Sequence, residues 1–118
     1  MAYQSFEDLE VWQRRFTLRD QIERAGLSIP SNITEGAERG SSKDFAHFLN
    51  FSKGSCGELR TQLYIARKLS ELDKSSFDFL IQESREISAM LQGLRTSMLR
   101  KSAAKEKRAH RKRLTLNT

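Results

Sequence analysis

The sequence predicts an all-α protein, an up-and-down antiparallel helical bundle, on two observations. Apolar or small residues recur in alternating steps of three and four over residues 45–66 and 77–98. This spacing keeps one face of a helix apolar, and a strand cannot produce it. The chain also has one proline and six glycines in 118 residues, fewer turn residues than a β protein needs. Short connections between such long helices imply antiparallel neighbours.

The first segment begins with a capping box, in which Ser5 precedes Asp8 by three residues. Its first apolar set is Phe6, Leu9, Trp12 and Phe16, and its second set is Leu18, Ile22, Ala25 and Ile29. Pro30 interrupts this pattern, because proline in a helix clashes with the carbonyl four residues earlier. That residue is Gly26, which eases adjustment, so a kinked continuous helix is favoured. The alternative is a break, with Ser28 capping a new helix.

The central helix has a capping box at Ser41 and Asp44 and is apolar on two faces. Its main stripe is Phe45, Leu49, Ser52, Cys56, Leu59, Leu63 and Ala66. The roughly opposite face carries Phe51, Gly54, Gly57, Tyr64 and Ile65. We expect the first face to pack inside the chain and the second to form the interface of a homo-oligomer, because two glycines on a helix face allow close approach of another backbone.

Asp73 or Ser75 is expected to cap the start of the last helix. Its stripe is Phe77, Leu80, Ser84, Ile87, Leu91, Leu94 and Met98, widened by Ile81 and Met90. Beyond Leu99 the same positions become basic, so helix can continue but a core cannot. The predicted organisation is a helical bundle domain over residues 1–99 and a basic C-terminal tail over residues 100–118.

The basic tail is the strongest functional signal. The net charge of the chain is +6, but residues 100–113 alone carry +7, which leaves the remainder at −1. The cations are Arg100, Lys101, Lys105, Lys107, Arg108, Arg111, Lys112 and Arg113. Such density favours nucleic acid, with RNA preferred, through phosphate contacts. The tail has no aromatic residue for base stacking. The alternative is a solubilising tail.

No catalytic constellation is visible. The two histidines, His47 and His110, lie in different parts of the chain, and no cluster has the spacing of a metal site. His47 is interpreted as a solvated residue beside the core stripe, and Cys56 as a small buried hydrophobe. We therefore expect no enzyme, no cofactor and no metal. Without a membrane span or a secretory signal, and with a single cysteine, the expected location is the cytoplasm.

Five segments resemble one protein family. They are residues 6–13 (FEDLEVWQ), 28–36 (SIPSNITEG), 39–45 (RGSSKDF), 58–63 (ELRTQL) and 90–94 (MLQGL). They look like the bacterial four-helix bundle proteins, also called 23S rRNA intervening-sequence proteins. The resemblance implies an all-helical subunit in a ring, commonly a pentamer, without known enzymatic activity. The related accessory variability proteins of diversity-generating retroelements bind a reverse transcriptase and nucleic acid, which makes a reverse transcriptase a possible partner.

The chain departs from this family near its start. In the family, a long first helix and its hairpin loop follow the Val-Trp-Gln motif, whereas here Gln13 is almost joined to the next segment. The first helix is therefore truncated or fused into the second, which leaves three long helices as the alternative to four. A missing helix is expected to expose part of the stripes at Ile22, Ile29, Leu59 and Leu91. Either a neighbouring chain covers these stripes or the fold is less stable than that of its relatives.

Two functional hypotheses follow. The leading one is a cytoplasmic, oligomeric scaffold that binds RNA or DNA non-specifically through the tail. The alternative is a structural or adaptor oligomer for a protein such as a polymerase, in which the tail only aids solubility.

Overall fold

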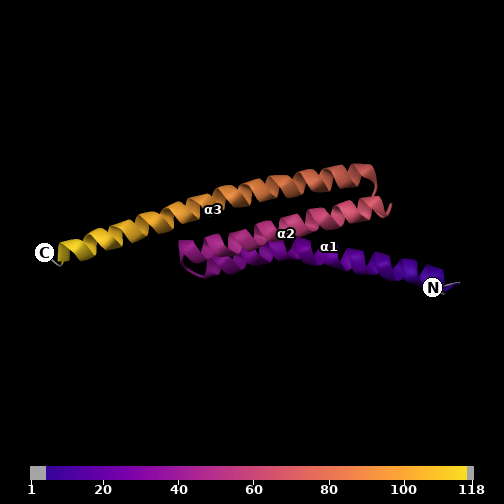
Figure 1. Cartoon of the computed structure of the whole chain (residues 1–118), viewed down its shortest axis with the longest axis horizontal. Coiled ribbons are helices and arrows are strands. Elements are labelled where there is room, and N and C mark those ends of the chain that lie inside the picture. The colour runs from indigo at the N-terminus through magenta and orange to yellow at the C-terminus, as the bar shows by residue number, and fades with distance from the viewer. Residues whose placement is uncertain (1–4, 117–118) are drawn as a thin grey trace.

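The computed structural model describes residues 5–116, which form three helices. These are α1 (Phe6–Glu38), α2 (Ser42–Lys68) and α3 (Lys74–Leu116). No strand occurs in these residues. Short turns join consecutive helices, which run antiparallel with α2 between the other two (Figure 1). The all-α prediction is confirmed, with three helices rather than four.

The first two predicted helical segments are one helix. The backbone amide of Asp8 donates to Ser5 Oγ at 3.2 Å, so the predicted capping box begins α1. The helix then runs for 33 residues without a break and includes Pro30 in its interior. Of the two alternatives for the first helix, truncation or fusion, the structure shows fusion, and the favoured continuous path through Pro30 is confirmed. Figure 1 shows that α1 is bowed along its length.

The turn between α1 and α2 depends on Gly40, whose φ of +84° lies in the left-handed region that favours glycine. Ser41 follows in an extended conformation, and its Oγ accepts from the backbone amide of Asp44 at 3.1 Å. The predicted start of the central helix is therefore confirmed. The central helix ends at Lys68.

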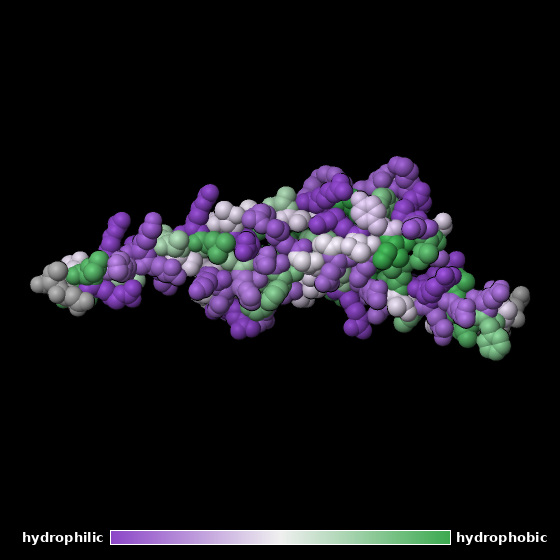
Figure 2. Space-filling model, viewed as in Figure 1, coloured by the Kyte–Doolittle hydropathy of each residue, from purple (hydrophilic) through white to green (hydrophobic). Residues whose placement is uncertain are grey.

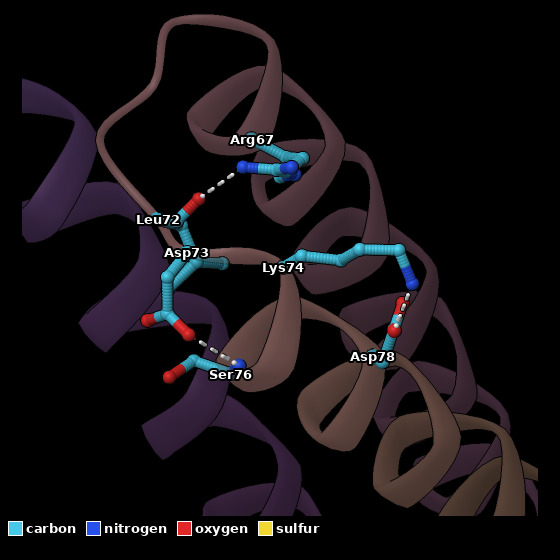
Figure 3. A network of polar contacts seen from close by, with 6 residues as sticks. All are labelled: Arg67, Leu72, Asp73, Lys74, Ser76 and Asp78. Carbon is cyan, nitrogen blue, oxygen red and sulfur yellow. Dashed lines mark hydrogen bonds and ion pairs between the residues drawn. The ribbon is translucent and has the colours of Figure 1, made fainter.

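Side chains hold the turn between α2 and α3 (Figure 3). Arg67 Nη1 donates to the carbonyl oxygen of Leu72 at 3.2 Å, and Asp73 Oδ2 accepts from the backbone amide of Ser76 at 3.0 Å. Of the two predicted caps, Asp73 is the one used. The amide of Ser76 lowers the pKa of the Asp73 carboxyl, because it stabilises the charged form. Lys74 Nζ pairs with Asp78 one turn later at 2.7 Å.

The molecule is an elongated layer, with extents of 83 × 25 × 15 Å. Its radius of gyration is 21.2 Å, against about 13–14 Å for a compact domain of this length. Within residues 5–116, α2 packs against both neighbours, and α1 and α3 make no backbone contact with each other. None of these helices carries an apolar stretch long enough to cross a bilayer.

Side chains from all three helices form the core, with α2 between the other two helices. It contains Ile29 from α1, Leu49 and Cys56 from α2, and Leu91 and Met98 from α3. The expectation that a missing helix exposes Ile29 and Leu91 is therefore wrong. Both are buried, because α2 side chains lie between them, and only Ile22 and Leu59 remain half-buried.

Buried serines connect the helices. Ser52 Oγ donates to the carbonyl oxygen of Ile29 at 2.8 Å, and Ser84 Oγ donates to that of Cys56 at 3.3 Å. Both serines are essentially inaccessible to solvent, so their satisfied hydroxyls let the helices approach closely at small cost. These are the two serines that the sequence places in the apolar stripes.

Candidate nucleic-acid interface

The cationic tail is the C-terminal continuation of α3. The helix runs without interruption to Leu116, and Met98 is its last buried residue. Figure 1 shows this end of α3 projecting past the turn between α1 and α2. The composition boundary at residue 99 therefore coincides with the end of the core but lies inside a helix. Residues 117–118, the end of the predicted tail, lie outside the described residues.

All eight predicted tail cations are exposed. None takes part in the ion pairs found among residues 5–116, so their charge is not compensated within the described part of the chain. Figure 2 shows mostly hydrophilic side chains along this projecting end, with a few hydrophobic ones among them. Residues 100–113 span about 20 Å of helix at 1.5 Å per residue, which places a high charge density on a thin rod.

Of the five residues of the predicted oligomer interface, Phe51, Gly54 and Ile65 are exposed on the outer side of α2, whereas Gly57 and Tyr64 lie toward α3. Phe51, Tyr64 and Ile65 are each about half exposed, at 48%, 50% and 45%. A Cβ atom added at Gly54 would meet nothing within 4 Å, and one at Gly57 would meet only Arg60 Nη2 at 4.0 Å. The packing of this single chain thus gives no reason for glycine at either position.

Tyr64 differs from the others in this set, because its side chain already packs within the chain. Its ring meets that of Phe77 on α3 edge to face, with centroids 5.0 Å apart. Its hydroxyl oxygen accepts from Arg85 Nη2 at 3.4 Å. Tyr64 therefore faces α3, whereas Phe51 makes no such contact with α3.

An aromatic group covers the first turns of α2. His47 is exposed, as predicted, with its ring centroid 4.5 Å from that of Phe51. Phe48 meets Phe51 edge to face at 5.7 Å, and the Arg39 guanidinium lies 5.0 Å above the Phe48 ring. These contacts place His47 within an aromatic group at the surface of α2.

Cys56 is buried, as predicted. Burial raises the pKa of its thiol, and the nearby Arg60 charge opposes this shift more weakly. A reactive cysteine needs exposure and a lowered pKa, so Cys56 has the opposite properties. Within residues 5–116, no group of three or more potential metal-ligating side chains gathers in one place.

The structure also brings together cations that the sequence analysis did not select. Lys53 and Arg60 of α2 and Arg85 of α3 line one hollow of about 290 Å³. Lys53 and Arg60 are seven residues apart, a spacing that keeps them on one helix face. Their convergence with Arg85 depends on how α2 and α3 pack, which no local pattern reveals.

Comparison with known proteins gives one family. A family model described as 23S rRNA-intervening sequence protein matches residues 3–93. The matched region includes α1, α2 and the core-forming part of α3 up to residue 93, and it ends before the cationic tail. Comparison with the curated proteins returns no match.

Proposed function

This chain belongs to the 23S rRNA-intervening sequence protein family, and we propose that it is a non-enzymatic, oligomeric scaffold that binds nucleic acid through its tail. The family model matches residues 3–93, which form most of the three-helix body, and the tail beyond residue 99 supplies the cations. RNA is favoured over DNA because the family description refers to intervening sequences of 23S rRNA. The phosphate-contacting residues are Arg100, Lys101, Lys105, Lys107, Arg108, Arg111, Lys112 and Arg113.

The observation that carries this proposal is the uncompensated charge of the projecting part of α3. Eight exposed cations within fourteen residues attract a polyanion and release its counterions on binding. Because the cations surround a helix, only some of them face a given ligand at one time. Contacts of this kind are with phosphate and carry little base preference.

Assembly of several chains supports the same function. Phe51 and Ile65 are half exposed, and Gly54 has open space around it, as expected for a surface that meets another subunit. A ring, pentameric by resemblance, brings several tails together and turns weak single contacts into avidity. We place this assembly in the cytoplasm.

The test replaces all eight tail cations with glutamine, a good helix former that removes charge while keeping the helix. Binding of labelled RNA is then titrated at two salt concentrations. We expect a loss of affinity of at least tenfold, and a log–log salt dependence that falls by about 0.7–0.9 for each phosphate contact removed.

The matched control exchanges lysine for arginine, and arginine for lysine, at the same eight positions. Because phosphate attraction depends mainly on charge, this control is expected to bind within about threefold of the parent protein. Equal binding by the parent and the glutamine variant would remove the tail from the mechanism.

The second candidate is an adaptor oligomer whose partner is a protein. The observation in its favour is a hollow of about 750 Å³ between the N-terminal half of α1 and the end of α2. Its lining includes Val11, Leu18, Ile65 and Leu69, which suit an apolar partner surface. The family resemblance suggests a reverse transcriptase. Co-purification that survives nuclease treatment favours this candidate, and its loss after nuclease treatment favours the first.

A further inference from the structure

Three cations of the helical body line one open hollow between α2 and α3. Lys53 and Arg60 come from α2 and Arg85 comes from α3, and the hollow has a volume of about 290 Å³. The other lining residues are Ser88, Ala89 and Gln92. No carboxylate belongs to this lining, which is drawn from the described residues. We call the three cations the body cluster.

The charge of the body cluster contrasts with that of the rest of the body. Outside residues 100–113 the chain has a net charge of −1, so acids there balance the bases as a whole. Arg19 and Arg24, for example, each pair with a carboxylate four residues away. The positions three and four residues from each cation of the body cluster hold no acid. The ion pairs among residues 5–116 do not include these cations either, so their charge is uncompensated.

Neutral groups orient the three cations. Lys53 Nζ donates to Gln92 Oε1 at 2.5 Å, and Arg60 Nη1 donates to Ser84 Oγ at 3.0 Å. Arg85 Nη2 donates to the hydroxyl oxygen of Tyr64 at 3.4 Å. These partners hold the side chains but leave their charges intact. Because Lys53 and Arg60 are half-buried, salt screens their charges less than those of fully exposed side chains.

Arg95 adds a fourth cation beside the hollow. It follows Gln92 by three residues, so the two are neighbours on the surface of α3. Its Nε atom is buried and has no hydrogen-bond partner within residues 5–116. A buried polar group without a partner is costly, above all when it is charged. An anion bound in the hollow reduces this cost.

Small residues keep the space between the cations open. Gly57 lies between Lys53 and Arg60 on the same side of α2, and a Cβ atom added there would lie 4.0 Å from Arg60 Nη2. Ser88 and Ala89 face the same space from α3. Lys53 and Arg60 are seven residues apart, or about 10 Å along the helix. The hollow therefore suits a ligand that carries several anionic groups in a row.

Linked phosphate groups are such a ligand. A single phosphate group carries a charge of about −1.5 to −2 at pH 7, less than the charge of the three cations. The guanidinium group is a planar fork of donors that matches phosphate oxygens. The lining has no aromatic side chain on which a base could stack, so recognition depends on the phosphates.

We propose that the hollow of the body cluster is a binding site for linked phosphate groups, supplied by free pyrophosphate or polyphosphate or by the backbone of a polynucleotide. This inference does not rest on the proposed function, because none of the residues of the site belongs to the tail.

The test measures binding of pyrophosphate to the full chain by isothermal titration calorimetry, with orthophosphate as the comparison ligand. The body variant replaces all three cations of the body cluster with glutamine. Its control replaces Arg19, Arg24 and Lys74 with glutamine, which changes the net charge equally at positions outside the hollow.

Two single substitutions at exposed positions guard against misfolding. Arg85→Gln removes one cation. Ala89→Glu places a carboxylate four residues after Arg85, where it pairs with the guanidinium and neutralises it from within the chain. The control for Ala89→Glu is Gln21→Glu, at an exposed position of α1 outside the hollow. Thermal melts by circular dichroism verify the folding of every variant.

We expect the parent protein to bind pyrophosphate at least tenfold more tightly than orthophosphate. The body variant and Ala89→Glu are each expected to lose at least about tenfold in affinity for pyrophosphate, and Arg85→Gln about fivefold, because charge-assisted hydrogen bonds are lost. Both controls, and the variant with a glutamine tail, are expected to change by less than about threefold.

Competition with unpaired RNA identifies the source of the phosphates. If RNA displaces pyrophosphate and the body variant also binds RNA more weakly, the hollow takes phosphates of the backbone. If the body variant loses pyrophosphate but binds RNA like the parent, the hollow takes a free ligand. Both outcomes support the site.

The inference is wrong if the parent binds no pyrophosphate, or if the body variant and Ala89→Glu bind it like the parent. Loss of pyrophosphate binding in the variant with a glutamine tail also overturns the inference, because the tail is then the binding site. The proposed function is judged separately, by RNA binding of that tail variant, and it fails if this binding equals that of the parent.

Discussion

Among the glycines, Gly36 has the tightest surroundings, because α1 packs closely against α2 at this residue. It is buried within α1, and a Cβ atom added there would lie 2.7 Å from Phe48 Cβ and 3.0 Å from Phe45 Cδ1. A Cβ position is set by its backbone, so the helices themselves would have to separate. No local pattern marks Gly36 as a packing residue, because the side chains it meets belong to another helix.

We predict that Gly36→Ala lowers the melting temperature. Overpacking costs about 1–3 kcal/mol, whereas alanine gains at most about 1 kcal/mol in helix propensity. The matched control is Gly93→Ala in α3, where the added methyl meets nothing within 4 Å and only the propensity gain remains. Thermal unfolding followed by circular dichroism measures both. A rise in melting temperature for Gly36→Ala equal to that of the control would contradict this packing.

At the scale of elements, each of the three helices begins at a capping side chain. Ser5, Ser41 and Asp73 each accept a hydrogen bond from a backbone amide three residues later. Asp73 is the only charged one of these three caps, so α3 is the helix whose cap depends on pH. The negative charge also suits the positive end of the helix dipole.

We predict that Asp73→Ala destabilises the protein at neutral pH and much less in acid. Because the folded-state pKa of Asp73 lies below the unfolded value, its contribution is present above about pH 4, the ordinary pKa of Asp, and is lost as pH falls through the folded pKa. The measurement compares melting temperatures of parent and variant between pH 7 and pH 3, with Ser75→Ala as the control. A difference that does not shrink with pH would mean that the charge of Asp73 is not what caps α3.

At the scale of the whole molecule, a thin helical layer leaves large apolar side chains at the surface. Phe6 is 86% exposed and Phe16 is 59% exposed on α1. Phe51 and Ile65 are half exposed on the outer side of α2. A monomer of this size rarely exposes so much apolar surface, which supports the proposed oligomer.

We predict that Gly54→Glu yields smaller species in light scattering, because a charged side chain enters the surface where backbones are proposed to meet. Phe51→Asp is expected to act in the same way. The control is Gly93→Glu, at an exposed glycine of α3 outside the proposed interface. If the mass stays the same in Gly54→Glu and Phe51→Asp, the outer face of α2 is not the interface.

The sequence by itself determined the helical character of the chain, the capped starts at Ser5 and Ser41 and the charge of the tail. Capping boxes and apolar stripes depend on residues three or four positions apart, so local physics decides them before any packing occurs. The predicted main stripe of α2 is confirmed as buried at Leu49, Ser52, Cys56, Leu63 and Ala66. The exposure of all eight tail cations also followed from the end of the apolar pattern at Leu99.

Only the tertiary structure decided which helix faces meet. It buried Ile29 and Leu91 against α2, made Gly36 a packing residue and brought Lys53 and Arg60 beside Arg85. The physical reason is that periodicity sets the direction of each side chain around its own helix axis, whereas its neighbours depend on the rotation and distance of other helices. Those quantities are set by contacts between residues that are far apart in the sequence, and the local pattern of either partner does not contain them.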